Sequence, residues 1–183
     1  MFYKTLLVLS QQLNDYLKLS FRLTEDIVYL CSVKDAENAL SANKVGISLV
    51  NVERETGRGI SFNHKNIGDS YSQKTAPSWQ LNLYVLISAI FSDKQYEESV
   101  KVFSGVLSFL QKNNTLVINE SGQQIAIEPV NLSFQELSNL WSICGGTYFP
   151  SILCKIRVLS IDEQEITDLS TVVRSEKLET RNN

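Results

Sequence analysis

The chain has 183 residues, of which 43% are hydrophobic and 20% are charged, and its formal net charge is −3. A chain of this length can bury roughly 70% of its unfolded surface as one domain, and it is too apolar to be disordered. Bulk electrostatic attraction to nucleic acid is excluded, because the pI is about 5.3 and no basic block is present.

The negative charge is concentrated at the C-terminus. Residues 162–183 hold six acidic and three basic side chains, whereas residues 1–161 hold fourteen of each. We therefore predict one domain over residues 1–161, followed by an acidic polar tail over residues 162–183.

Three cysteines, Cys31, Cys144 and Cys154, occur without a C-x-x-C spacing. Their odd number argues against a closed disulfide framework and fits a reducing cytoplasm. No window approaches the ~20 apolar residues that cross a bilayer, and the N-terminus lacks the core of a signal peptide. We expect a protein that is cytoplasmic when made and does not insert into a membrane, with Cys144 and Cys154 as core residues.

The first part of the chain predicts one helix and two strands before a long irregular stretch. Residues 4–19 place leucines along one side of an amphipathic helix. β-Branched and aromatic residues favour strands over 27–33 and 44–55. Residues 56–78 show no such pattern and are expected to form a loop. Connections longer than about 15 residues are usually functional, although a disordered surface loop is an equal alternative.

The middle of the chain is more strongly patterned. Residues 79–91 are apolar on both alternating faces, which predicts a central strand covered on both sides. Residues 93–112 predict a helix with two neighbouring apolar stripes, a wider surface than one sheet face needs. We expect this helix to contact a second partner, either the N-terminal helix or another subunit. Two short strands are expected at 115–119 and 124–130.

The segment 133–161 is the most informative part of the chain. Ser133 and Glu136 have the spacing of a capping box, and Gly145 with Gly146 are suited to end the helix that follows. An alternating apolar strand completes the segment. These elements predict an α+β fold: a single domain with a mixed or antiparallel sheet of about five to six strands and three main helices.

No group of residues predicts catalysis. His64 is the only histidine, so a histidine-based triad or a zinc site lacks partners. The glycines near it fit neither a phosphate-binding loop nor a dinucleotide-binding pattern. We predict no catalytic, metal or cofactor site, no small-molecule substrate and no nucleic-acid partner.

Four blocks of the sequence resemble the Pvc16 (DUF4255) family, the cap or tail-terminator proteins of phage-tail-like contractile injection systems. They are the N-terminal helix with LTEDIVYL, then KVGISLVNVERE, LNLYVLISAIFSDKQYEESVKVFSGVLSFLQ and LSFQELSNLWSICGGTYFPSILCKIRVLSI, and they cover nearly all of residues 1–161. The resemblance implies a tail-terminator-like fold. It also implies a ring, thought to be hexameric, that ends the inner tube and the sheath at the end distal to the baseplate.

The same resemblance implies the partners: further copies of the chain, an inner tube protein and a sheath protein, within a particle that can be released from the cell. Another tube- or sheath-adaptor component of the same machine is one alternative. An enzymatic or small-molecule-binding domain is the other.

Interface residues are expected on the last strand, in the tail and in the long loop. Lys155 and Arg157 lie on one side of the last strand, where they could meet the acidic tail of a neighbouring subunit. Burial within the chain, with a solvated edge, is the alternative. The candidate interface residues are Leu153, Lys155, Arg157, Asp162, Glu163, Glu165, Arg58 and His64.

Overall fold

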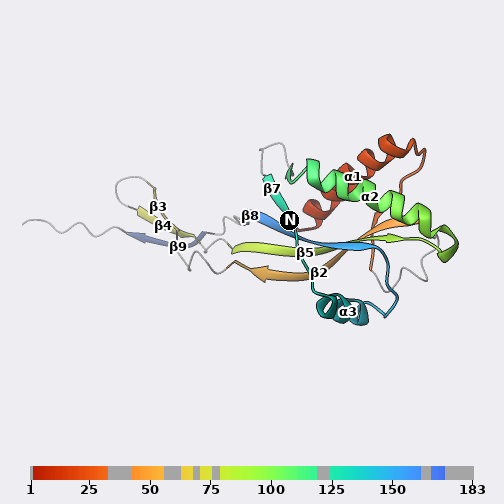
Figure 1. Ribbon diagram of the computed structural model, residues 1–183. Coiled ribbons are helices and arrows are strands. Elements are labelled where there is room, and N and C mark those ends of the chain that lie inside the picture. The colour runs from red at the N-terminus through yellow and green to blue at the C-terminus, as the bar shows by residue number, and fades with distance from the viewer. Residues whose placement is uncertain are drawn as a thin grey trace, which may run out of the picture. The chain divides into compact units, whose positions relative to one another are not determined.

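The computed structural model describes seven segments of the chain, residues 2–32, 43–55, 63–67, 71–75, 79–118, 124–161 and 166–171 (Figure 1). The chain divides into two compact units. Unit 1 holds residues 1–54 and 80–159, and unit 2 holds residues 55–79 and 160–183.

Unit 1 is built on a six-stranded sheet with the strand order β1-β2-β5-β8-β7-β6. Along the sheet these are β1 (Val28–Leu30), β2 (Lys44–Arg54), β5 (Trp79–Ile90), β8 (Ser151–Ile161), β7 (Gln124–Pro129) and β6 (Thr115–Val117). β1 is parallel to β2, whereas the β2–β5, β7–β8 and β6–β7 pairs are antiparallel.

Three helices accompany this sheet: α1 (Phe2–Phe21), α2 (Tyr96–Lys112) and α3 (Phe134–Ile143), with a short 3-10 turn, η2 (Asp93–Gln95), before α2. α1 and α2 cover one face of the sheet, and α3 lies against the other (Figure 1). The predicted α+β class, with a mixed sheet and three main helices, is confirmed.

The central strand β5 divides its side chains between two hydrophobic clusters. Leu83, Val85 and Ile87 are fully buried with residues of α1 and α2. Leu86 points to the other face, where it packs with Trp141 of α3 and Leu153 of β8. The prediction of a central strand covered on both sides is therefore confirmed.

α1 and α2 approach each other closely at Gly105. A Cβ atom at this position would lie 2.8 Å from Cε2 of Phe21 and 2.9 Å from Cδ2 of Leu17. Separations below 3 Å are far inside van der Waals contact, so the spacing of the two helices requires a residue without a side chain. α1 is thus one of the two partners that the wide apolar surface of α2 was expected to contact.

The start of α3 confirms the predicted capping box. The Ser133 N–H donates to Oε2 of Glu136 over 2.8 Å, and the Glu136 N–H donates to Oγ of Ser133. These bonds lower the pKa of the Glu136 carboxyl, because they favour its charged form. Gly145 and Gly146 adopt φ angles of 113° and 89°, the left-handed conformation predicted for the end of the helix.

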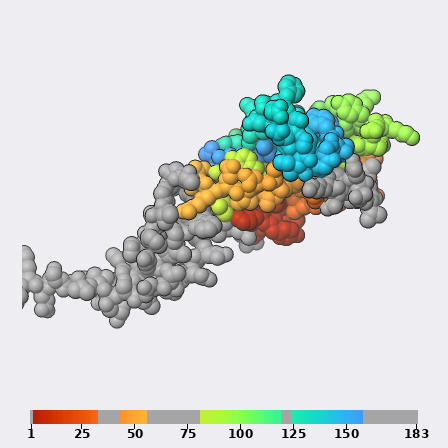
Figure 2. Space-filling view, turned by 90° about the horizontal axis from the view of Figure 1, so that it is seen from below, coloured from red at the N-terminus to blue at the C-terminus, as the bar shows by residue number. Residues whose placement is uncertain are grey.

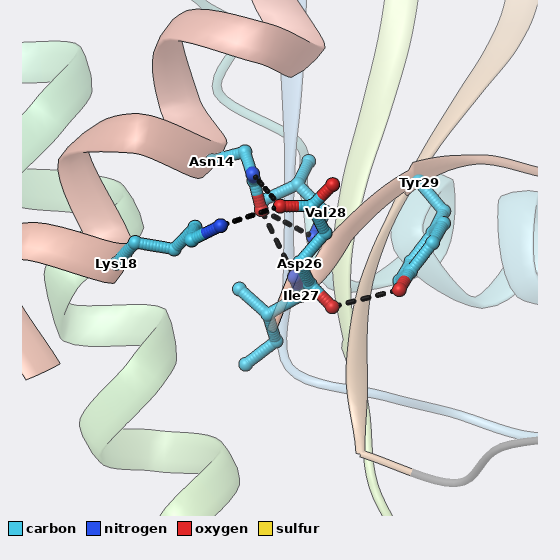
Figure 3. Close-up of polar contacts among 6 residues, drawn as sticks. All are labelled: Asn14, Lys18, Asp26, Ile27, Val28 and Tyr29. Atoms are coloured by element: carbon cyan, nitrogen blue, oxygen red, sulfur yellow. Dashed lines mark hydrogen bonds and ion pairs between the residues drawn. The ribbon is translucent and has the colours of Figure 1, made fainter. Parts of the chain in front are cut away.

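A polar anchor fixes β1 to α1 (Figure 3). Oδ1 of Asn14 accepts from the N–H groups of Ile27 and Val28, over 2.9 and 3.2 Å. Nδ2 of Asn14 donates to Oδ1 of Asp26 over 2.8 Å, and Nζ of Lys18 lies 2.9 Å from the same oxygen.

The anchor depends on a charged Asp26. The hydrogen bond from Lys18, followed by the one from Asn14, lowers the pKa of Asp26 below its usual value. A lowered acid pKa stabilises the folded state above the unfolded-state pKa, so this contribution is lost as the pH falls through the lowered value, below about 4.

The sequence expectation of a loop over residues 56–78 is corrected by unit 2, which contains a three-stranded antiparallel sheet of order β3-β4-β9. Part of the expected loop 56–78 forms the strands β3 (Asn63–Ile67) and β4 (Tyr71–Thr75), so His64 lies in a strand. Part of the expected tail forms β9 (Ile166–Thr171). The residues of these strands are mostly polar. Because the strands are held together by main-chain hydrogen bonds, the sequence shows no alternation of apolar and polar residues from which they could be predicted. The predicted boundary after residue 161 stays a prediction.

Replacing Gly105 by valine tests the close contact between α1 and α2. We expect Gly105→Val to lower the free energy of unfolding by about 1–3 kcal/mol, since an overpacked contact must push the helices apart. Urea denaturation would measure the change. The matched control is Ser108→Val on the exposed side of the same helix, and an equal loss in both variants would contradict the close contact.

Replacing Asn14 by alanine tests the polar anchor. The N–H groups of Ile27 and Val28 would lose their acceptor, and the bond to Val28 is buried. We expect a loss of about 1–3 kcal/mol in the free energy of unfolding. Gln11→Ala, at an exposed position of the same helix, is the control, and a denaturation midpoint unchanged by Asn14→Ala would refute the role of this side chain.

Candidate interaction surfaces

The described part of the chain presents two apolar surfaces and a charged strand face. No group of three side chains suited to hold a metal ion occurs among the described residues. None of the helices that the structure describes has the length and apolarity needed to cross a membrane.

The cysteines fit structural roles. Cys154 is fully buried, and burial raises the pKa of its thiol to about 12, which makes it the core residue that the sequence predicted. Cys144 is only half-buried and packs at the margin of the cluster around Trp141. Cys31 is also half-buried, and no disulfide joins any of the three.

The outer side of α2 carries an exposed apolar stripe. Tyr96 is 62% exposed, Val100 and Leu107 are each 40% exposed, and the half-buried Phe103 lies between them. These residues follow one another at spacings of four, three and four, so they share one face of the helix. Adjacent exposed apolar side chains of this kind mark a contact surface more strongly than single ones do.

A second apolar surface lies on the α3 side of the sheet, as a groove of about 430 Å³. Its walls are the two residues that follow β1 (Cys31 and Ser32), β2 and the C-terminal end of α3. Leu49 and Val50 of β2 and Ile143 of α3 are exposed and line it. No charged side chain contributes to the lining, so the groove suits an uncharged, apolar partner.

The structure places three of the predicted interface residues on one face of β8. Leu153 is only 9% exposed, because it packs in the cluster with Trp141 and Leu86. Lys155 is half-buried, with Glu128 of β7 as its partner in the strand register. The side chain of Arg157 is 50% exposed, and its Nη2 lies 3.1 Å from Oε2 of Glu128.

The other predicted interface residues do not join this group in the structure. Arg58, Asp162, Glu163 and Glu165 lie outside the described residues, and His64 lies in β3 of unit 2. The role of all eight residues at an interface stays a prediction.

Sequence reasoning missed the groove and Glu128. The groove joins residues more than 100 positions apart, and Glu128 meets Arg157 only through the β7–β8 register. The one local signal was the run Leu49, Val50 and Val52, which is more apolar than a strand with a single buried face requires.

Two solved structures share the fold. One is the sheath/tube terminator of the extracellular contractile injection system PVC in the extended state, with a TM-score of 0.69 and 15% sequence identity. The other is the cap of the anti-feeding prophage, a tube terminating cap, with a TM-score of 0.58 and 19% identity. At such identities the likeness concerns the fold, and it confirms the predicted tail-terminator-like architecture.

The alignments include nearly all of this chain but less than two thirds of each of the other two chains. The alignments cover 100% and 90% of this chain, against 64% of the PVC terminator and 57% of the prophage cap. A comparison with curated protein sequences finds no match.

The family is defined by a match over most of the chain. The Pvc16 N-terminal domain matches residues 5–175, a range that includes the described strands of both compact units. The resemblance drawn from the four sequence blocks is thereby confirmed, and the chain belongs to the Pvc16 N-terminal domain family.

Proposed function

We propose that the chain is a structural terminator that ends the inner tube and the sheath of a contractile injection system, at the end distal to the baseplate. The observation that carries this proposal is the family match over residues 5–175. The fold shared with a sheath/tube terminator and a tube terminating cap supports it. The role is one of assembly, without an enzymatic step.

The proposed terminator works as a closed ring of identical copies, six in number as the family resemblance implies. A ring larger than a dimer needs two different surfaces on each copy, because each contact is heterologous. Each copy must therefore present two unlike surfaces that fit each other.

Contacts with the tube and the sheath are assigned by the proposal to charged and polar groups. For the tube and the sheath these are Arg58 and His64 of the expected loop and Asp162, Glu163 and Glu165 of the tail, whereas Lys155 and Arg157 on β8 are candidates to meet the acidic tail of a neighbouring copy. Charged groups at a rim give specificity and faster encounter more than affinity, which suits a protein that must recognise one end of a polymer. The proposal has the chain made in the cytoplasm and carried on a particle that can be released.

A tube-growth experiment tests the terminator function. We expect the purified chain, added to polymerising inner tube protein, to bind at one end of each tube and to stop growth there. Electron microscopy of the gold-labelled chain and the distribution of tube lengths would measure both effects. Binding without arrest of growth would favour an adaptor component, and no binding to tube or sheath would overturn the proposal.

Replacing Arg157 by alanine tests β8 as a contact between copies, on which binding of the ring to tube ends would depend. The ion pair with Glu128 is exposed, so its loss should change the free energy of unfolding by less than about 1 kcal/mol. We expect end-binding to weaken several-fold while thermal denaturation stays nearly unchanged. Lys94→Ala, at an exposed position of η2, is the control, and equal binding by both variants would remove Arg157 from the interface.

A further inference from the structure

We propose that copies of this chain join edge to edge, with β6 of one copy adding to β2 of the next as a parallel strand. The sheet of unit 1 would then continue from copy to copy around the ring. This inference rests on the ring of the proposed function and specifies the strands that close it.

β2 extends well beyond its pairing with β1. β1 pairs only with Val45 to Ile47, whereas β5 follows β2 on its other side as far as Arg54. No described strand pairs with residues 49–53 on the β1 side. Figure 2 shows β2 (orange) at the surface between α3 (teal) and α1 (red). An unpaired strand of this length is a template for another strand.

Hydrogen bonds show which main-chain groups point out of this edge. The Val45 N–H donates to O of Ile27, and the Cys31 N–H donates to O of Ile47, so residues 45 and 47 face β1. The register with β5 shifts between Leu49 and Asn51, so that Val50 is an extra residue in a β-bulge. Before the bulge the odd-numbered residues point their main-chain groups away from β5, and after it the even-numbered residues do. Beyond this bulge, Val52 and Arg54 face outward.

The outward direction of Val52 has direct support. Its N–H donates to Oδ1 of the neighbouring Asn51 over 2.9 Å. This local bond satisfies an amide that would otherwise lack a partner at the edge, and a side chain can swing away when a strand arrives. Asn51 therefore protects the edge in the single chain without blocking it.

The opposite end of the sheet offers a second open edge. The Ile127 N–H donates to O of Asn114, so Asn114 and Leu116 face β7, and Thr115 and Val117 face outward. The side chains show the same alternation, because Leu116 is buried in the core and Val117 is 50% exposed.

The two edges agree in strand direction. The end of β5 lies beside the start of β8, where the Ala89 N–H donates to O of Pro150, so these strands are antiparallel. β7 and β6 reverse the direction twice more, and β6 therefore runs in the same direction as β2. A copy displaced by rotation around a ring would bring β6 beside β2 as a parallel strand, which is how β1 already pairs with β2.

The two edges also agree in the faces of their side chains. Val52 pairs with Leu83 and so lies on the face covered by α1 and α2, which is the face of Leu116. In a parallel pair, opposite residues have side chains on the same face, and only one of the two directs its main-chain groups at the other strand. Val52 and Leu116 lie on the same face. Val52 directs its main-chain groups out of the β2 edge, whereas Leu116 directs its own toward β7, so the two can lie opposite each other.

The pairing is compatible in charge as well. The residues of β6, Thr115 to Val117, are uncharged, so Glu53 and Arg54 of β2 meet no like charge there. Pairing β2 with a second β2 would give a two-fold dimer and no ring, because the same edge would be used by both copies.

Cysteine cross-linking tests the pairing directly. With Val52 opposite Leu116, the exposed Glu53 and Val117 are neighbours on the α3 face. The double variant Glu53→Cys/Val117→Cys, oxidised mildly with oxidised glutathione, should give a ladder of covalent multimers that ends at the ring number. The rate of cross-linking should exceed that of Glu53→Cys/Leu19→Cys by roughly 1,000-fold, since pairing raises the effective thiol concentration from the micromolar to the millimolar range.

The single variants and the ring itself separate the outcomes. Mixed chains with Glu53→Cys or Val117→Cys alone should give dimers only, and each variant by itself should give none above the level of the unsubstituted chain. Dimers from Glu53→Cys alone would overturn the inference in favour of β2–β2 pairing. If mass photometry shows rings but the double variant gives no ladder of cross-linked multimers, only this inference is overturned. The same holds if the chain is a monomer that still arrests tube growth. A chain that neither forms rings nor binds tube ends would overturn the proposed function as well.

Discussion

The structure of unit 1 depends on β5, a strand of 12 residues that is apolar on both faces. A strand buried on both sides must have a layer on each side, and the chain provides two unequal layers. The helices α1 and α2, of 20 and 17 residues, cover one face, whereas α3 on the other face has only 10 residues. The apolar groove beside Leu49 and Val50 lies at the margin of this smaller layer. The shortness of α3 thus accounts for the groove, whereas the stripe lies on the outer side of α2.

The edges of the unit 1 sheet are formed by short strands. Both edge strands, β1 and β6, have three residues, and β1 is fixed by Asn14 of α1 through main-chain amides. Short edge strands limit unwanted pairing in soluble proteins. β2 departs from this rule, because it extends seven residues beyond the end of its pairing with β1. β2 is protected from unwanted pairing by local features, the bulge at Val50 and the hydrogen bond between Asn51 and Val52. The hydrogen bond can break when another strand binds, so this protection is reversible.

Sequence patterns predicted those parts of the fold whose signals are local. The capping box at Ser133, the glycines after α3 and the double-sided apolar pattern of β5 each have a physical cause within a few residues. β3, β4 and β9 were missed because β9 comes from a segment about 90 residues after β4, and polar strands held by main-chain bonds leave no periodic trace. Leu153 was assigned to an outer face, and only the packing of Trp141 shows that α3 covers it. The contact surfaces were the hardest to predict, because exposure is a property of the whole fold.

Family membership bears on how the contacts divide between the two units. The matched range runs to residue 175 and so includes the residues of β3, β4 and β9. If the edges of the unit 1 sheet close the ring, these edges are no longer available to other partners. The tube and the sheath must then be bound by the remaining surfaces, among them the stripe on α2, the groove beside α3, the outer face of β8 and unit 2. The first two are apolar and the other two largely polar, and a terminator of two concentric polymers needs at least two surfaces of different chemistry to distinguish them.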